Sequence, residues 1–168
     1  TTLDLGVNTA FENRIGGDIN YIEDSGTNEG AFFERNKTQR ISTQFNLQHQ
    51  FSEQSRLTIR NSFNTFSRVI TIPDYVFDGV QNSTFSEVTY SHNGENSDWI
   101  AGVNLWTDDF SEEKFNTFPL RNYNQTTYGA FVQNTLKASD WLSLETGIRG
   151  DYVIDYGFAF LPRLSALL

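Results

Sequence analysis

Four carboxylates fall within six residues of a long polar stretch, residues 108–123, that the sequence predicts as a loop: Asp108, Asp109, Glu112 and Glu113. Carboxylate oxygens are the ligands that hard cations such as Ca²⁺ prefer. Their spacing matches no calcium-binding loop, and Lys114 adjoins them. We therefore expect a solvated acidic loop without a bound metal, placed to meet a basic or metal-bearing ligand.

Aromatic side chains flank these carboxylates. Such residues near strand ends usually form a girdle at a membrane interface, although some could instead stack on a ligand. The flanking aromatics are Trp106, Phe110, Phe115, Phe118 and Tyr123. The expected ligand contacts are Asp108, Asp109, Glu112, Glu113, Trp106 and Tyr123.

A second charged group lies in a segment where apolar and polar residues alternate. Alternation in a strand sends successive side chains to opposite faces. Glu145, Arg149 and Asp151 should therefore face away from the apolar Leu144 and Ile148. Arg149-Gly-Asp151 also spells an integrin-binding tripeptide, but that recognition needs an exposed loop tip. We expect these charges to face a wet lumen and to pair with neighbours, or else to form an ion pair that only fills space.

The sequence offers little for catalysis. His49 and His92 are its only histidines, and both lie next to predicted short turns. A Ser-His-Asp site needs a base oriented between a nucleophile and a carboxylate, and nothing local provides one. His49 falls on the same face of its predicted strand as the apolar residues, which indicates a position at a membrane interface. No phosphate loop, paired metal ligands or dinucleotide fingerprint occurs. We expect no catalytic residue, no cofactor and no metal.

The elements that position these residues are strands. Alternation over four to eight residues or more is typical of half-buried strands. It predicts strands over residues 2–10, 37–51, 56–70, 98–107, 126–137, 141–154 and 160–168. Residues 84–91 form a weaker strand whose facing cannot be assigned. Residues 11–14 are either a short turn or part of one strand that runs to Tyr21, so the number of strands is eight or nine.

Short connections alternate with long ones along the chain. The short turns are expected at 11–14, 52–55, 92–97 and 138–140, and the longer loops at 24–30, 72–79, 108–123 and 155–157. Short turns at one end and long loops at the other are typical of outer-membrane barrels. We therefore predict an all-β fold: an antiparallel up-and-down meander, part of a transmembrane β-barrel, with residues 1–168 as a single segment.

Composition agrees with this fold class and excludes others. The chain has 168 residues, a net charge of -9 and no cysteine. The acidic balance argues against a nucleic-acid partner, because phosphate binding relies on clustered Lys and Arg. No run approaches the roughly 18 apolar residues that a membrane helix needs.

Three segments near the end carry a family resemblance: Tyr128-Gly-Ala-Phe-Val-Gln133, residues 141–152 and Phe160-Leu-Pro-Arg163. The types of these three segments, and their order along the chain, resemble the barrel of a TonB-dependent outer-membrane receptor. The resemblance implies a bacterial outer-membrane protein that takes up a scarce solute, such as a metal chelate or an oligomeric nutrient, and performs no covalent chemistry. It implies outer-membrane lipid, the remaining barrel and plug, and an inner-membrane energy-coupling protein as partners. Since that family's barrels have about 22 strands, the chain should be an internal barrel fragment without the plug.

Two alternatives stay open at this stage. One is a secreted, soluble β-sandwich that binds carbohydrate or protein, and the other is a small outer-membrane barrel enzyme that acts on lipid. A sandwich buries its apolar faces between two sheets, whereas a barrel exposes them on one outer wall. The residues that discriminate are Trp99, Val103, Leu105, Leu142, Leu144 and Ile148.

Overall fold

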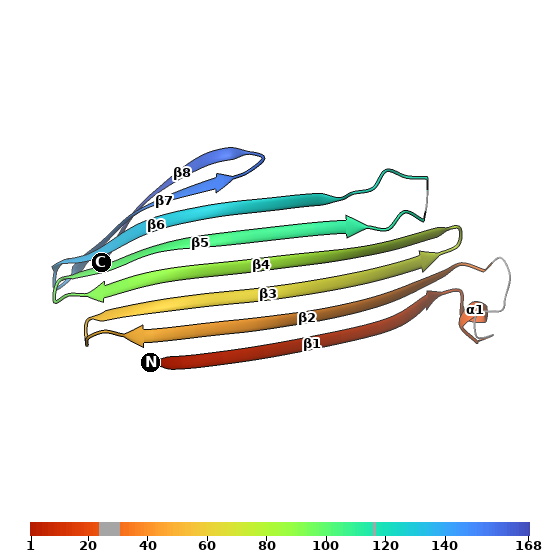
Figure 1. Cartoon of the computed structure of the whole chain (residues 1–168), viewed down its shortest axis with the longest axis horizontal. Coiled ribbons are helices and arrows are strands. Elements are labelled where there is room, and N and C mark those ends of the chain that lie inside the picture. The colour runs from red at the N-terminus through yellow and green to blue at the C-terminus, as the bar shows by residue number, and fades with distance from the viewer. Residues whose placement is uncertain (24–30, 116) are drawn as a thin grey trace.

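The computed structural model describes residues 1–23, 31–115 and 117–168. They form eight strands and one short helix, α1 (Ile19–Glu23). The strands are β1 (Thr2–Gly17), β2 (Phe33–Gln50), β3 (Ser55–Ile72), β4 (Tyr75–Asn93), β5 (Ser97–Glu112), β6 (Tyr123–Ser139), β7 (Leu142–Val153) and β8 (Gly157–Leu167). Each pairs antiparallel with the next, so one sheet runs in sequence order from β1 to β8 (Figure 1). This is the predicted all-β meander.

The pairing register sorts the side chains into two faces, because partners across an antiparallel ladder point to the same side. One row across the sheet joins Ile59, Val88, Val103 and Ala130. The adjacent row, on the opposite side, joins Arg60, Glu87, Asn104 and Gly129. We call the first side the apolar face and the second the charged face.

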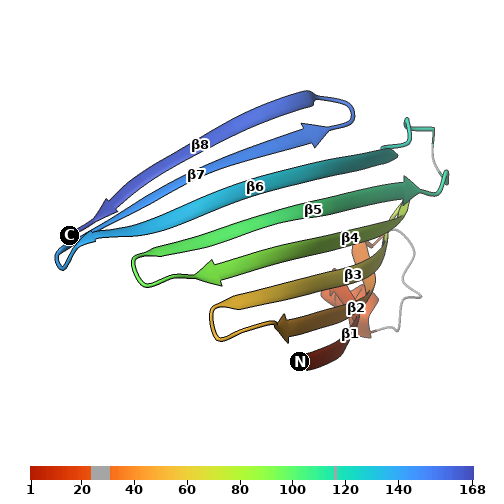
Figure 2. The ribbon, with the colours of Figure 1, turned by 60° about the vertical axis from the view of Figure 1, so that its left-hand side comes forward.

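The apolar face is open and the charged face is crowded. Val103 and Ile148 are 57% and 51% exposed, whereas the side chains of Glu87 and Asp151 are only 15% and 17% exposed. Side chains converge on the concave face of a curved sheet and spread apart on its convex face. Figure 2 shows that the sheet is curved: β1 to β3 lie in a different plane from β6 to β8. The sheet therefore curves around its charged face.

This arrangement contradicts the soluble sandwich. Among the described residues the only buried hydrophobic side chain is Tyr21, and the eight strands belong to one sheet. Of the discriminating residues, Trp99, Val103 and Ile148 are exposed, and Leu105, Leu142 and Leu144 are half-buried. An apolar face with no second sheet against it fits a barrel wall.

The first predicted turn, at residues 11–14, is wrong. β1 continues through it and pairs with β2 without interruption up to Gly17, so there are eight strands and not nine. The longer alternative is also only partly right. The strand stops at Gly17, whose φ of 131° belongs to a region that side chains rarely adopt, and Ile19 and Tyr21 lie in α1.

Two predicted loops are shorter than the sequence indicates. Residues 72–79 contain a two-residue turn, in which Pro73 ends β3 and Asp74 adopts φ 62°. The loop at 108–123 begins only after Glu112, because β5 extends through Asp108, Asp109 and Glu112. The last predicted connection, at 155–157, is a turn of the same length at 154–156, and β8 starts at Gly157 with φ 87°. The strict alternation of short and long connections is therefore wrong.

The connections still differ between the two ends of the sheet. At one end the connections span residues 51–54, 94–96 and 140–141, and all are short. At the other end lie α1 and the loop at 113–122, together with the two tight turns. We call this second end the loop end. The predicted loop at 24–30 falls outside the described residues. Within the described part of the chain, no helix is long and apolar enough to cross a membrane.

Candidate ligand-binding site

A stack of aromatic rings lies on the charged face at the loop end. The rings of Phe77 and Phe110 lie 6.4 Å apart at 16°, and those of Phe110 and Tyr123 lie 5.6 Å apart at 25°. They come from β4, β5 and β6, which are neighbouring strands of the sheet, and the pairing register aligns the three rings. Gly79 makes room for the stack, because an added Cβ would lie 2.7 Å from the Phe77 ring and 2.9 Å from the Phe110 ring.

Asp108 forms the polar side of this stack. Its two carboxylate oxygens accept hydrogen bonds of 2.9 and 3.0 Å from Nε2 of Gln81. The hydroxyl of Tyr123 donates to Oδ2 of Asp108 at 3.1 Å. These bonds fix one edge of the Tyr123 ring and hold a carboxylate beside the aromatic surface.

Arg121 ties the following loop to the strands. Its Nε and Nη2 each donate to Glu112 at 2.8 Å, and its backbone N–H donates to Glu112 Oε2 at 3.2 Å. Nη2 also donates to the hydroxyl of Tyr75 at 3.3 Å, and the guanidinium lies 5.0 Å from the centre of the Phe77 ring. The hydrogen bond with Glu112, followed by that with Tyr75, raises the pKa of Arg121 above its usual value.

The structure divides the expected ligand contacts between the two faces. Asp108, Glu112, Trp106 and Tyr123 lie on the charged face. Asp109 lies on the opposite face and accepts a 3.0 Å hydrogen bond from Asn124. Glu113 follows the end of β5, where its N–H donates to the carbonyl of Asp78. The carboxylates therefore do not form a single solvated loop.

A metal site from these carboxylates has no support. Strand alternation separates Asp108 and Glu112 from Asp109. Within the described part of the chain, no three His, Cys, Asp or Glu side chains gather closely enough to hold a metal ion.

Sequence reasoning missed four residues of this cluster: Tyr75, Phe77, Gln81 and Arg121. The first three lie at odd-numbered positions of β4 and therefore on one face of that strand. The sequence did not reveal this pattern because residues 72–79 were predicted to be a loop. No sequence signal pairs Arg121 with Glu112, because that contact depends on how the loop folds back.

A separate charged network lies nearer the middle of the charged face. Nε of Arg149 lies 2.8 Å from Oδ2 of Asp151, and the same guanidinium contacts the amide of Asn104. Glu145 forms an ion pair of 2.8 Å with Arg163 of β8. The expected pairing of Arg149 with a neighbour is present, and the tripeptide Arg149-Gly-Asp151 lies within β7 rather than at a loop tip.

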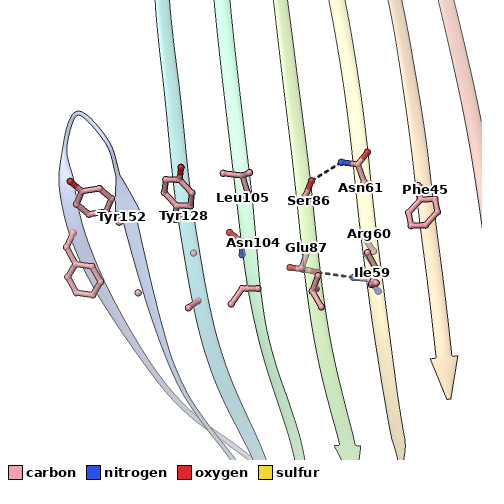
Figure 3. Close-up of a pocket in the computed structure, with 16 residues that line it drawn as sticks. Phe45, Ile59, Arg60, Asn61, Ser86, Glu87, Asn104, Leu105, Tyr128 and Tyr152 are labelled. Carbon is pink, nitrogen blue, oxygen red and sulfur yellow. Dashed lines mark hydrogen bonds and ion pairs between the residues drawn. The ribbon is translucent and has the colours of Figure 1, made fainter. Parts of the chain in front are cut away.

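A hollow that is separate from this site lies on the apolar face (Figure 3). It is a shallow groove of about 620 Å³ between two rows of side chains. Ala130 and Gly150 leave space in one row, and Tyr128, Tyr152 and Phe158 border it in the other. Its lining is mainly apolar, and two of its polar members are joined by a hydrogen bond of 2.8 Å from Nδ2 of Asn61 to the hydroxyl of Ser86.

The two histidines also lie on the apolar face, close to the short turns. His92 Nδ1 lies 2.9 Å from the Ser55 hydroxyl, and His49 Nδ1 lies 2.6 Å from the Thr1 hydroxyl. The hydroxyl of Tyr90 donates to Ser55. Among the described residues no carboxylate completes a triad with either histidine.

A curved antiparallel sheet with an exposed apolar face and a crowded charged face defines a segment of a transmembrane β-barrel. The chain belongs to the family described as TonB dependent receptor-like, beta-barrel, whose pattern matches residues 1–168. A search of curated proteins gave no match.

Two solved structures share the fold. The copper transporter OprC matches with a TM-score of 0.58 and 12% identity, over 80% of this chain and 27% of its own. The siderophore receptor PirA from Pseudomonas aeruginosa matches with a TM-score of 0.53 and 14% identity, over 81% of this chain and 26% of its own. The chain thus spans about a quarter of the length of these relatives.

Proposed function

We propose that this chain is part of a receptor in the bacterial outer membrane that takes up a scarce solute by energy-coupled transport. Family membership and the names of the two similar structures, a copper transporter and a siderophore receptor, support this function. The solute belongs to the class of metal chelates or oligomeric nutrients. The receptor would bind and move its solute without a covalent step, as the names of these two structures suggest.

The observation that carries the proposal is the opposite character of the two faces. Exposed Val103, Ile148 and Tyr152 would face lipid, and crowded Glu145, Arg149 and Asp151 would face the lumen. A charge on the lipid side of a barrel costs about 2–4 kcal/mol near the midplane. The ion pairs therefore occupy the side on which water or a plug can satisfy them.

The length of the strands supports an orientation. A membrane-spanning strand needs about 9–11 residues, but β2 to β5 have 18, 18, 19 and 16. The surplus lies at the loop end, where even the apolar face turns polar with Lys37, Asp78, Asn82 and Asp109. We infer that this end projects outside the cell and that the short turns face the periplasm.

The aromatic and charged cluster then lies at the outer mouth of the barrel. Asp108, Glu112, Trp106 and Tyr123 would contact the solute from the lumen side, whereas Asp109 and Glu113 would not. A flat ring could extend the stack of Phe110 and Tyr123, and Asp108 could accept hydrogen bonds from the same ligand.

The partners follow from this placement. Outer-membrane lipid would cover the apolar face, and the remaining strands and the plug would enclose the charged face. The edges of β1 and β8 that the sheet leaves unpaired would pair with further barrel strands. An inner-membrane energy-coupling protein would supply the driving force.

The test is accumulation of labelled solutes by cells. The full-length receptor is expressed in a Gram-negative host deleted for its own receptors, and a panel of iron chelates, copper complexes and oligosaccharides is supplied. We expect accumulation of one panel member that stops when the energy-coupling protein is deleted or a proton uncoupler is added. Accumulation that persists without the coupling protein, or recovery of the receptor outside the outer-membrane fraction, would overturn the proposal.

A further inference from the structure

A pocket on the charged face is lined by three arginines. It measures about 350 Å³ and lies across β1, β2 and β3 toward the loop end. The residues that line it are Ala10, Phe11, Glu12, Arg14, Asn36, Thr38, Arg40, Phe66 and Arg68. Three guanidinium groups against one carboxylate give this lining a net charge of +2, although the whole chain carries -9.

Each arginine is held by a contact that leaves donors available. Arg68 Nε donates to Oδ1 of Asn36 at 3.1 Å, and Asn36 is 98% buried. The guanidinium of Arg40 lies over the ring of Phe66, 4.9 Å from its centre. Arg14 approaches Glu12 at 3.5 Å, which is a long contact between exposed groups.

The guanidinium groups of Arg40 and Arg68 lack a carboxylate partner. Within the described part of the chain, neither forms an ion pair. By contrast, Arg60, Arg149 and Arg163 on the same face all do. A guanidinium group can donate two parallel hydrogen bonds to a carboxylate or a phosphate. Two guanidinium groups that line one pocket and have no carboxylate partner therefore suit an anion.

The pocket adjoins the aromatic cluster. One cross-strand row runs through Arg40, Phe66, Gln81, Phe110 and Tyr123. The neighbouring row on that face joins Thr38, Arg68, Gly79 and Glu112. A solute against the Phe110 ring could therefore extend toward the arginines along the same rows.

We propose that this pocket is a subsite for an anionic group, a carboxylate or a phosphate, on the transported solute. This inference rests on the proposed function and adds to it a class of solute. Arg68 and Arg40 bind the anion, Asn36 and Phe66 hold their guanidinium groups in place, and Glu12 limits the excess positive charge.

The experiment is titration of the intact receptor, purified in detergent, with citrate and with inorganic phosphate. Calorimetry follows binding to the wild type, to Arg40→Gln, to Arg68→Gln and to the double variant. Arg60→Gln is the control, because Arg60 lies on the same face but outside this pocket and is paired with Glu87. Heat-modifiable gel mobility confirms that every variant is folded.

We expect the wild type to bind at least one anion, and each single pocket variant to bind it about tenfold more weakly. Binding of citrate alone identifies a carboxylate subsite, and binding of phosphate alone a phosphate subsite. The subsite is overturned if neither anion binds, if Arg60→Gln weakens binding equally, or if anions bind only after the plug is deleted, since the pocket would then hold a plug segment. Energy-dependent accumulation without anion binding would remove the subsite and leave the proposed function standing.

Discussion

Arg149 and Asp151 lie two residues apart on one face of β7, with Nε of the arginine 2.8 Å from Oδ2 of the aspartate. Both side chains are partly buried, and Oδ1 of Asp151 has no hydrogen-bond partner. An added Cβ on Gly129 would lie 2.6 Å from that oxygen. The pair therefore fills a space that the neighbouring strand keeps open by having no side chain there.

Removing the arginine should destabilise the barrel. Arg149→Leu leaves Asp151 without its cation on a crowded face, and leaving a buried charged group unsatisfied costs about 1–3 kcal/mol. We expect the full-length receptor to lose its heat-resistant gel mobility at a lower temperature. The double variant Arg149→Leu/Asp151→Leu should recover part of the loss, because no unpaired charge remains. Equal losses in the single and double variants would contradict a stabilising pair.

Gly79 should be needed for the aromatic stack. In Gly79→Ala the added methyl group would collide with the rings of Phe77 and Phe110, and overpacking of this kind costs about 1–3 kcal/mol. The expected result is weaker solute binding by the intact receptor together with a lower unfolding temperature. The matched control is Gly16→Ala in β1, where no atom lies within 4 Å of the new Cβ. A Gly79→Ala receptor that behaves like the control would show that the rings can separate freely.

Alternation in the sequence predicts strands well where one face is apolar without interruption. β7 is such a strand, with Leu144, Ile148 and Tyr152 on one face. It predicts β4 poorly because Ser86 and Asn82 take apolar-face positions in that strand. Within the predicted segment 84–91, Val88 and Tyr90 lie on the apolar face, but two residues are too few to show which face of a strand is apolar.

The ends of the strands were the least predictable part. Toward the loop end both faces of the sheet carry polar side chains, such as Asp108 and Asp109, so polarity no longer marks a strand and the sequence there resembles a loop. Asp108 and Tyr123 could be identified as candidates from composition alone, since charge and aromatics concentrate there. Their partner Gln81 could not, because the 2.9 Å contact with Asp108 depends on the register between β4 and β5. Register is set by the whole ladder and not by any local motif.

Glu112 should hold the loop at 113–122 against the strands. Glu112→Gln cannot balance the charge of Arg121, so the two 2.8 Å contacts between them lose their ionic character. Local opening should therefore rise about two- to fivefold. Tryptic cleavage after Arg121 on intact cells should accelerate by that factor. Asp109→Asn is the control, because Asp109 contacts Asn124 on the other face. Equal acceleration in the control would indicate a general loosening of β5.

The assignment of the two faces can be tested with adjacent residues of β7. Leu144 lies on the apolar face and pairs with Leu136, and Ser143 lies on the charged face and pairs with Lys137. Leu144→Arg places a charge against lipid, at a cost of up to about 2–4 kcal/mol that depends on depth, whereas Ser143→Arg places it in the lumen. We expect the full-length Leu144→Arg receptor to reach the outer membrane in a smaller amount and the Ser143→Arg receptor to assemble normally. The measurement is the fraction with heat-modifiable mobility in outer-membrane preparations. The reverse order would mean that the charged face meets lipid, and the lumen placement of Arg149 and Asp151 would fall with it.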